Sequence, residues 1–387
     1  MNIGIVPPYN ALPPHTRELR AEVREFIRQD QAEFGWQAHV DSWIASWDPA
    51  FSRRLGDQGW LGLTIPKKFG GHGRSHLDRY VVTEELLAAG APVAAHWVAD
   101  RQVGPALTKY GNRYQCERYL PAISRGECYF AIGMSEPESG SDLANVQTRG
   151  VQVDGGWEVS GTKVWTSGAH HAHAFFVLAR TEPLDTTKRH RGLSQFVIEL
   201  DAPGIEIRPI RLLTGQHHFN EVVLDRVFVG DDMVLGHPGK GWAQVTSELG
   251  FERSGPERLL STTPLIDELA NEMRRRPNAH DSTAELGALI SRLSTLRQLS
   301  ASIAGCLSVG EPADLAAAVV KDLGTQYEAS VVEVAATTFD DALPDISSDK
   351  DFPRLLAEGI LHTPGFTLRG GTSEILRGVV ARGMGLR

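Results

Sequence analysis

The sequence predicts an α+β protein of several domains, with a helical N-terminal part, a β-rich middle and a helical C-terminal part. The chain has 387 residues, of which 41% are hydrophobic, and this is enough to bury more than one core. The spacing of apolar residues is helical at first, changes to a period of two near residue 129, and becomes helical again after residue 235. We therefore predict domains over residues 1–128, 129–235 and 236–387.

The N-terminal part is expected to start with a long helix, because Leu19, Val23, Phe26 and Ile27 recur at helical spacing. Residues 80–87 and 103–110 continue this helical pattern. The middle part alternates apolar and polar residues between clusters of turn formers. Its expected strands cover residues 175–179, 195–200, 205–210 and 222–229.

Two helices are expected in the C-terminal part. Residues 316–334 form one of them, and the other carries an apolar face made of Leu286, Leu289, Ile290, Leu293 and Leu296. Residues 274–281 and 340–351 are rich in charged residues, Ser and Pro, so they are predicted to be loops.

Composition limits the classes of function. The net charge is −9 and no basic stripe is visible, so nucleic acid is not expected as a partner. Cys116, Cys128 and Cys306 are too few and too scattered for a disulfide framework, which favours a reducing compartment. The N-terminal residues do not resemble a secretory leader, and no apolar run reaches the ~18 residues of a membrane span. We expect a cytoplasmic protein without a membrane span.

Two strings of residues carry the strongest chemical signal. Residues 134–142 read MSEPESGSD, a dense turn cluster that follows an apolar run, and residues 161–168 read GTKVWTSG. Between them, residues 151–160 alternate around Asp154-Gly155-Gly156, which predicts a hairpin whose second strand leads into Trp165. An indole and several hydroxyls near one another suit the apolar face and polar edge of a flavin ring. An ordinary hairpin with a core Trp is the simpler alternative.

Both strings resemble the flavin-binding loops of the acyl-CoA dehydrogenase family. We call residues 134–142 the first flavin string and residues 161–168 the second flavin string. Further strings match that family in the same order along nearly the whole chain. They are residues 55–66 (LGDQGWLGLTIP), 69–71 (FGG), 84–86 (EEL), 239–242 (GKGW) and 371–377 (GTSEILR). The resemblance is to bacterial members. It implies the fold of that family, in which a helical domain, a β-barrel or β-sandwich domain and a four-helix bundle follow one another.

The resemblance also implies α,β-dehydrogenation of an acyl-CoA thioester, in which a carboxylate removes the α-proton and the β-hydrogen leaves as hydride to FAD. In one branch of the family the base is the Glu of a Tyr-Glu-Gly-Thr string near the C-terminus. This chain has Arg369-Gly370-Gly371-Thr372 there, and glycine cannot accept a proton. A second branch places the base in a Glu-Arg pair on a helix after the β domain, and Glu252-Arg253 matches that pair.

We therefore predict Glu252 as the base, since a general base needs a carboxylate within reach of the proton. The alternative is an exposed helical Glu that serves as an ion-pair partner. Pro256 adds a further expectation, because proline cannot donate to the carbonyl four residues earlier and should kink the helix at Glu252. By position, Arg253 and Ser141 contact the substrate, and the backbone N–H of Gly370 donates to the thioester carbonyl.

The cofactor contacts carry over from the family by position. Ser135 and Ser141 match flavin or phosphate contacts, Trp165 matches the residue that packs on the ring, and Ser167 matches the hydroxyl near N5. The full set of expected FAD-binding residues is Met134, Ser135, Gly140, Ser141, Trp165, Thr166, Ser167, Thr372 and Glu374.

Two family motifs are missing. Homotetrameric members carry Arg-x-x-Phe-Gly early in the bundle, which clamps the FAD pyrophosphate of a neighbouring subunit, and Phe-Gly-Gly in a later loop. Here those places hold Arg276-Pro277-Asn278 and residues 337–341 (TTFDD). Because an arginine fork is not easily replaced, the sequence resembles a subunit of the α2β2 heterotetrameric members, which a paralogous subunit completes. A diverged homo-oligomer is the alternative.

Three hypotheses for the function follow. The first is an FAD-dependent acyl-CoA dehydrogenase of fatty acid or steroid side-chain β-oxidation that passes electrons to an electron-transferring flavoprotein. The small residues Gly250, Ser254 and Gly255 near the proposed base leave room for a bulky acyl group. The second is a catalytically silent partner subunit, and the third is a flavin monooxygenase or oxidase of the same fold.

Histidines gather after the second flavin string, at His170, His171, His173, His217 and His218. No matching set of cysteines or carboxylates accompanies them, so no metal site is predicted. They are expected to line the rim of the acyl-CoA site or a subunit interface.

Overall fold

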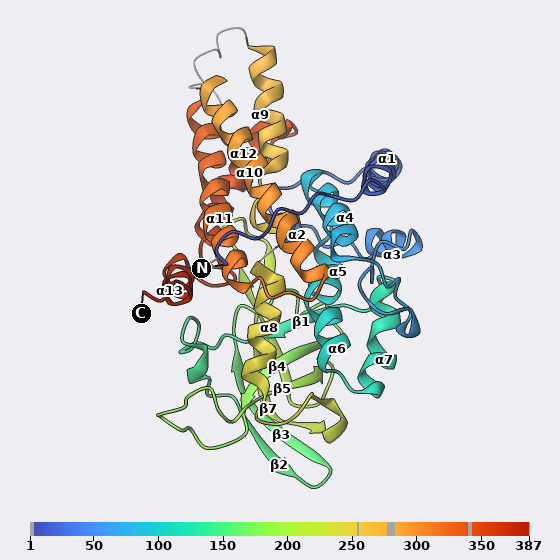
Figure 1. Cartoon of the computed structure of the whole chain (residues 1–387), viewed down its shortest axis with the longest axis vertical. Coiled ribbons are helices and arrows are strands. Elements are labelled where there is room, and N and C mark those ends of the chain that lie inside the picture. The colour runs from blue at the N-terminus through green and yellow to red at the C-terminus, as the bar shows by residue number, and fades with distance from the viewer. Residues whose placement is uncertain (1–3, 254, 277–282, 340–342, 387) are drawn as a thin grey trace. The chain divides into compact units, whose positions relative to one another are not determined.

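The computed structural model describes residues 4–253, 255–276, 283–339 and 343–386, and of residues 249–252 it describes the backbone alone. The described chain confirms the predicted fold class, with helices first, strands in the middle and helices at the end (Figure 1). The first part contains α1 (Thr16–Phe34), α2 (Ser42–Ala45), α3 (Pro49–Asp57), η1 (Lys67–Phe69), α4 (His76–Ala88), α5 (Ala94–Val98), the π-helical turn η2 (Ala99–Val103), α6 (Gly104–Tyr110) and α7 (Arg113–Ser124).

The middle part contains the strands and two short helical turns. They are β1 (Phe130–Gly133), η3 (Leu143–Asn145), β2 (Arg149–Val153), β3 (Gly156–Lys163), β4 (Ala174–Arg180), β5 (Leu193–Glu199), β6 (Ile205–Arg211), β7 (His217–Gly230), η4 (Asp231–Met233) and β8 (Val234–Leu235). The last part contains α8 (Gly241–Arg253), η5 (Pro256–Arg258), α9 (Thr263–Arg275), α10 (Thr283–Ser308), α11 (Asp314–Thr337), α12 (Asp351–Phe366) and α13 (Ser373–Gly383). None of the helices in the described ranges is long and apolar enough to cross a membrane.

Local sequence explains where several elements start and stop. Asp48 caps α3 by accepting a hydrogen bond from the Phe51 N–H at 2.9 Å, and Ser75 and Asp78 form a capping box at the start of α4. The helix that was expected to kink near Pro256 instead ends at Arg253, and a 3₁₀ turn starts at Pro256. A proline at the first position of a turn loses no hydrogen bond that the turn needs.

The chain forms two compact units, each built from segments that are distant in sequence. One unit comprises residues 48–74 and 94–251, and the other comprises residues 1–47, 75–93 and 252–387. We call them the sheet unit and the bundle unit. The domain boundaries at residues 128 and 235 stay a prediction.

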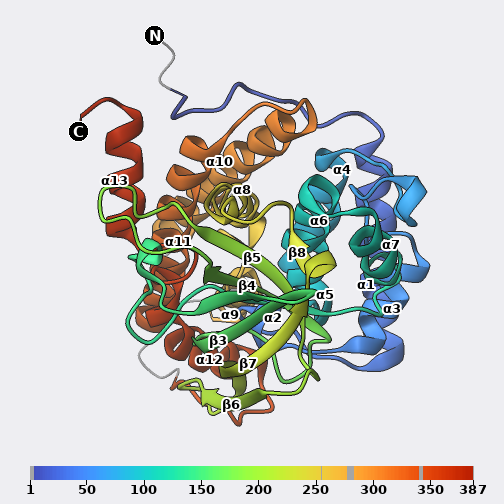
Figure 2. The same cartoon turned by 90° about the horizontal axis from the view of Figure 1, so that it is seen from below.

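In the sheet unit, the described strands form one sheet in the order β6-β7-β3-β2-β4-β5-β8, and β1 pairs in parallel with β4. Figure 2 labels strands β3 to β8 of this sheet. The predicted hairpin is confirmed, since β2 and β3 pair antiparallel and Val153 lies opposite Gly156 across the Asp154-Gly155 turn. The side chains of β4 and β5 are buried along almost their whole length. The sheet therefore has a core on both faces.

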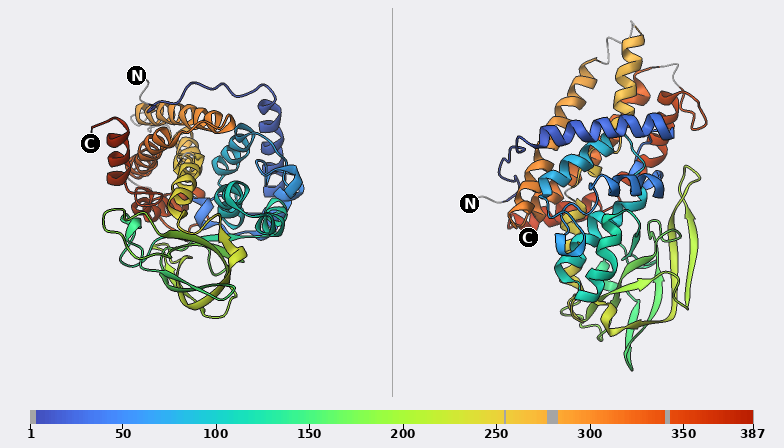
Figure 3. Two further views of the ribbon diagram at one scale, coloured as in Figure 1. Left: turned by 60° about the horizontal axis from the view of Figure 1, so that its bottom comes forward. Right: turned by 90° about the vertical axis from the view of Figure 1, so that its right-hand side faces the viewer.

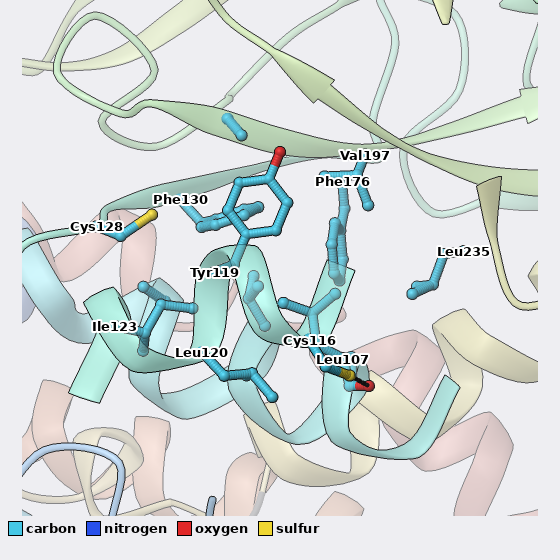
Figure 4. Packing of buried hydrophobic residues seen from close by; sticks show 14 of the residues in the cluster. Leu107, Cys116, Tyr119, Leu120, Ile123, Cys128, Phe130, Phe176, Val197 and Leu235 are labelled. Atoms are coloured by element: carbon cyan, nitrogen blue, oxygen red, sulfur yellow. Dashed lines mark hydrogen bonds between the residues drawn. The ribbon is translucent and has the colours of Figure 1, made fainter. Parts of the chain in front are cut away.

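One of these cores joins α6 and α7 to strands β1, β4 and β5 (Figure 4). The Phe130 ring meets Tyr119 edge-on at 5.1 Å and Phe176 at 5.8 Å between ring centroids. Cys116 and Cys128 are small buried members of this core, as expected for cysteines outside a disulfide framework. The core holds the amino end of β1 through Phe130, and the first flavin string starts directly after this strand, at Met134.

In the bundle unit, α9, α10, α11 and α12 run alongside one another (Figures 1 and 3). Leu289 and Leu296 of α10 are buried as predicted, but Ile290 is exposed, because one residue along a helix turns the side chain by about 100°. The unit also buries charge. Glu84 of α4 lies 2.8 Å from the Arg297 guanidinium and accepts a hydrogen bond from the Tyr80 hydroxyl at 2.7 Å.

Glu328 of α11 is a buried acid in this bundle, with an exposed fraction of 0%. Its Oε1 accepts a hydrogen bond from the Ser261 N–H at 2.9 Å, while Oε2 has no partner among the described residues. Burial raises the pKa of Glu328 to about 8, and the neighbouring Asp41 charge adds to the rise against the opposing effect of Arg369. Ionising Glu328 in the folded protein is therefore unfavourable at neutral pH.

We predict that Glu328→Gln stabilises the protein increasingly as the pH rises. A raised pKa in the folded state means that this carboxyl contributes most to stability below about pH 4.5 and that the contribution is lost as the pH rises to about 8. The gain in the free energy of unfolding at pH 8 should be on the order of a few kcal/mol. Urea unfolding of both proteins between pH 5 and pH 8.5 tests this, and a difference that does not change with pH would contradict it.

Candidate functional site

The first flavin string is held in place by a buried ion pair between Glu136 and Lys163. Lys163, the last residue of β3, has an exposed fraction of 0%, and its Nζ lies 2.7 Å from Glu136 Oε1 and 3.2 Å from the Met134 carbonyl oxygen. Glu136 also accepts hydrogen bonds from the backbone N–H groups of Gln147 and Thr148. The start of the loop is thereby tied to the ends of two strands.

The charges of this pair follow from its surroundings. Burial acts to raise the pKa of Glu136, but the Lys163 charge and the hydrogen bonds lower it below its ordinary value. Burial lowers the pKa of Lys163 to about 8, although Glu136 opposes the shift. Sequence reasoning missed both residues, even though each lies inside one of the two strings on which the flavin prediction rests.

The second flavin string turns back onto the first. The Val164 N–H donates to the Ser135 carbonyl at 2.9 Å, so the two strings lie side by side, as predicted. Trp165 adopts a left-handed backbone conformation with φ 59°, and its side chain is 58% exposed while its ring edge meets Phe219 at 5.8 Å. A bulky residue with positive φ is strained and persists only where its surroundings hold it.

Hydrogen bonds from strand β7 hold the backbone around Trp165 in place. Thr166 and Asn220 exchange backbone hydrogen bonds at 3.0 and 3.1 Å, and the Asn220 side chain donates to the Thr166 carbonyl at 2.9 Å. The Gly168 N–H donates to the His218 carbonyl at 2.9 Å. The backbone around Trp165 is thus fixed although the indole is exposed.

These loops fit a flavin. An exposed indole on a fixed backbone offers an apolar face, and the buried Thr166 Oγ1 has no hydrogen-bond partner among the described residues. Ser135 and Ser167 are half-buried, while Gly140 and Ser141 are exposed. Met134 packs against the cluster of Leu178, Leu193 and Val245. The structure thus brings the Met134–Ser135 and Trp165–Ser167 segments together.

The bundle unit contains the remaining predicted site residues, which are Glu252, Arg253, Gly370, Thr372 and Glu374. Residues 369–371 form a turn, which we call the glycine turn. Gly370 and Gly371 have φ of 66° and 98°, which strongly favour glycine. The Gly370 carbonyl accepts a hydrogen bond from Arg253 Nε at 3.1 Å, and the Gly371 carbonyl accepts one from the buried Lys321 Nζ at 2.7 Å. Arg253 of the Glu-Arg pair therefore contacts the position where glycine replaces the other branch's base.

Glu252 has its backbone in α8, but its side chain lies outside the described residues, as does Ser254. The glycine turn leads into α13, which Thr372 caps by accepting a hydrogen bond from the Ile375 N–H at 3.4 Å. Glu374 is exposed in the first turn of that helix, and hydrogen bonds from its own backbone and from Thr372 lower its pKa. A carboxylate is favourable there because the N-terminus of a helix carries partial positive charge.

The histidines after the second string form a stack. His170 lies parallel to His217 with 3.7 Å between ring centroids, and His171 lies 4.0 Å from His170. Burial and the two neighbouring imidazoles lower the pKa of His170 to about 4, so it is neutral at pH 7. Across the described ranges, no group of three or more His, Cys, Asp or Glu side chains is arranged to hold a metal ion.

The two segments that stand where the missing family motifs would be contact each other in the bundle unit. The Arg276 guanidinium lies over the Phe339 ring, 4.5 Å from its centroid, and Arg276 Nε lies 3.2 Å from Glu272. Residues 277–282 and 340–342 of these segments lie outside the described residues. Arg276 thus interacts with its own chain.

We predict that Glu136→Gln weakens flavin retention, because it leaves the buried Lys163 without a counter-charge. Removing one partner of a buried ion pair costs about 3–5 kcal/mol, and here the loss should loosen the first string. Thermal unfolding and the ratio of flavin to protein absorbance measure the two effects. Asp142→Asn is the matched control, since it removes an exposed ion pair with Arg189 from the same loop and should cost at most about 1 kcal/mol. Equal losses in both variants would refute the anchoring role.

The chain matches two models of one protein family. Residues 13–127 match the acyl-CoA dehydrogenase N-terminal domain, and residues 131–227 match the acyl-CoA dehydrogenase middle domain. Acyl-CoA dehydrogenase IpdE1 of Mycobacterium tuberculosis is 35% identical over 341 residues, which cover 86% of each chain. Acyl-CoA dehydrogenase FadE34 of the same organism is 34% identical over 84% of this chain, which spans only 44% of FadE34. FadE29, also of that organism, is 35% identical over 62% of each chain.

Solved structures agree with these relatives. The Tcur3481-Tcur3483 steroid ACAD superposes with a TM-score of 0.83 at 28% identity, covering 100% of this chain and 99% of that one. A chain of the ChsE4-ChsE5 complex from Mycobacterium tuberculosis gives a TM-score of 0.80 at 26% identity, with coverage of 96% and 97%. The chain therefore belongs to the acyl-CoA dehydrogenase family of FAD-dependent oxidoreductases.

Proposed function

We propose that this chain catalyses the α,β-dehydrogenation of an acyl-CoA thioester, with Glu252 as the base. The observation that supports this most directly is the hydrogen bond from Arg253 Nε to the Gly370 carbonyl. Through this bond Arg253, the residue after Glu252, contacts the turn where a Gly stands in place of the other branch's base. In this proposal the two departures from that branch compensate each other, because the sequence lacks a carboxylate at position 370 and has one at Glu252.

Gly370 keeps one catalytic role in this proposal. As the α-proton leaves, the thioester carbonyl gains negative charge and needs hydrogen-bond donors. The backbone N–H of Gly370 is such a donor, and the hydrogen bonds that Arg253 and Lys321 make to the following carbonyls restrict its direction. A donor that is held in place before the reaction does not have to reorganise when the charge develops.

The residues proposed to hold FAD are Met134, Ser135, Gly140, Ser141, Trp165, Thr166, Ser167, Thr372 and Glu374. When bound, FAD supplies the acceptor for the β-hydrogen, which leaves as hydride. The exposed Trp165 indole packs on the ring, and the hydroxyls of Ser135, Thr166 and Ser167 supply hydrogen bonds. In this proposal Arg253 and Ser141 would contact the substrate, and an electron-transferring flavoprotein would be the partner that accepts the electrons.

The acyl group is proposed to be large, such as a steroid side chain or a fatty acyl chain. This rests on the similarity to a chain of a steroid ACAD and on the glycines at positions 250 and 255 beside the Glu-Arg pair. A pocket that must admit a bulky group excludes large side chains near the base.

We also propose that the active protein contains a paralogous subunit. Arg276 contacts Phe339 and Glu272 of its own chain, and the Arg-x-x-Phe-Gly motif that clamps pyrophosphate in homotetramers is missing around it. Similar chains occur in two-component structures, the Tcur3481-Tcur3483 protein and the ChsE4-ChsE5 complex. A second chain of the same fold can supply the phosphate contacts that this one lacks.

We expect Glu252→Gln to lower the rate of substrate-dependent flavin reduction by ~10²- to 10⁴-fold, the usual contribution of a general base. The measurement is anaerobic bleaching of the flavin by octanoyl-CoA, isovaleryl-CoA and a CoA thioester of a steroid side chain. Glu285→Gln, at an exposed position of α10, is the control and should leave the rate unchanged. An unchanged rate in Glu252→Gln would assign the chain a silent role, and rapid reoxidation of the reduced flavin by O₂ would favour an oxidase or monooxygenase.

The subunit proposal predicts that the chain purified alone carries less than one FAD per chain. Co-expression with a paralogous acyl-CoA dehydrogenase chain of the same organism should restore a stoichiometric flavin spectrum and the native mass of a mixed oligomer. Absorbance spectroscopy and native mass spectrometry measure both. A homo-oligomer with one FAD per chain would overturn the proposal.

A further inference from the structure

Arg369, the first residue of the glycine turn, is tied to a buried acid that is 328 positions away in the sequence. Its Nη1 donates a hydrogen bond to Oδ2 of Asp41, whose exposed fraction is 0%. Its guanidinium also lies over the Trp43 ring at 4.8 Å and the Phe366 ring at 5.5 Å from the centroids. A planar guanidinium that is both ion-paired and stacked has little rotational freedom.

Asp41 is itself fixed from several sides. Its backbone is left-handed, with φ 61°, and its N–H donates to the Ser261 carbonyl at 2.9 Å. His362 Nδ1 lies 3.3 Å from the same carboxylate oxygen that binds Arg369. Burial acts to raise the pKa of Asp41, but the charges of Arg369 and His362 and their hydrogen bonds lower it well below its ordinary range. Asp41 is therefore a rigid, ionised partner for Arg369.

The peptide group between Arg369 and Gly370 carries the N–H that faces the thioester in the proposed reaction. Arg253 and Lys321 hold the carbonyls that follow this peptide. Asp41 holds the side chain of the residue that precedes it. If only the following carbonyls or only the Arg369 side chain were held, the plane of this peptide group could still tilt. The direction of the Gly370 N–H therefore depends on the contacts on both sides of the peptide group.

We propose that Asp41 is a positioning residue for the reaction, acting through Arg369 to orient the backbone N–H of Gly370. This inference rests on the proposed function, in which that N–H stabilises the charge on the thioester carbonyl. Asp41 itself touches neither substrate nor cofactor in this account. A displacement of about 1 Å in a catalytic group can cost ~10²-fold in rate, so loosening the turn should affect the rate more than binding.

Glu358 offers a matched control for Asp41. It is also a buried carboxylate that joins α12 to the segment around residue 40, since it accepts hydrogen bonds from the Val40 N–H at 3.0 Å and from Arg354 at 2.9 Å and lies 2.8 Å from His39 Nδ1. Its partners do not include the glycine turn. Glu358→Gln therefore removes a comparable buried charge without touching Arg369.

The test compares Asp41→Asn, Glu358→Gln and the unchanged protein, each as the flavin-loaded oligomer. Steady-state kinetics with the most active of the three CoA thioesters above gives kcat and KM. Exchange of the α-proton for deuterium, followed without an electron acceptor, isolates the step that needs the base and the N–H donor. Thermal unfolding reports the structural cost of each change.

We expect both variants to lose comparable stability, but only Asp41→Asn to lower kcat and the exchange rate, by ~10- to 100-fold with KM changed less than about threefold. Equal kinetics in the two variants would overturn the positioning role. If Asp41→Asn does not fold, Arg369→Lys replaces it, because lysine keeps the charge but lacks the stacked planar group. That variant should show the same loss of kcat, and normal kinetics would again overturn the inference.

The proposed function can fail separately from this inference. If the unchanged protein exchanges no α-proton, or Glu252→Gln exchanges it as fast, the base assignment is wrong. If exchange depends on Glu252 while Asp41→Asn behaves like Glu358→Gln, only the positioning role is wrong.

Discussion

The glycine turn depends on cationic side chains that come from distant parts of the chain. Arg253 of α8 and Lys321 of α11 donate to two successive carbonyls, and the side chain of Arg369 is held by Asp41. Positive φ values at Gly370 and Gly371 permit the turn, but they do not select it among the many conformations open to glycine. The charged partners hold the turn in the conformation seen here, and the backbone N–H of Gly370 lies within this turn.

The sheet unit uses the same physical device at the flavin strings. The buried Glu136–Lys163 pair holds irregular backbone next to the ends of β1 and β3, just as Asp41 and Lys321 hold the glycine turn. A buried ion pair adds little net stability compared with a well-packed apolar pair, but breaking one partner is costly. Such pairs therefore specify geometry, and they occur here where the backbone departs from helix or strand and where the proposed chemistry needs fixed groups.

Sequence patterns were sufficient for features that depend on local interactions. The hairpin at Asp154-Gly155 was predicted because two strands and their turn are contiguous, and the fold class followed from the change in apolar period. The pattern was wrong at Ile290, which is exposed, and at Pro256, where the helix ends instead of kinking. The sequence does not decide whether a residue at the edge of an apolar helix face is buried, or whether a helix kinks or ends before a proline. Tertiary packing decides both.

The candidate site was only partly accessible from sequence. Positions in the two flavin strings and at Gly370 could be named because the family resemblance fixes them in order. The residues that hold these positions could not be paired from the sequence. Lys163 is 27 residues from Glu136 and Asp41 is 328 residues from Arg369, and no regular spacing of residues connects positions so far apart. Contacts of this kind depend on how the segments of each unit fold together.

In the proposed reaction, the Gly370 N–H donates a hydrogen bond to the substrate's thioester carbonyl. Infrared difference spectroscopy of a ¹³C-labelled acyl-CoA thioester bound to the flavin-loaded Glu252→Gln variant, which should bind without turnover, tests it most directly. We expect the carbonyl stretch to shift to lower wavenumber than in the free thioester, and we expect this shift to shrink when Asp41→Asn is added. A bound carbonyl that absorbs at the frequency of the free thioester in water would rule out this hydrogen bond.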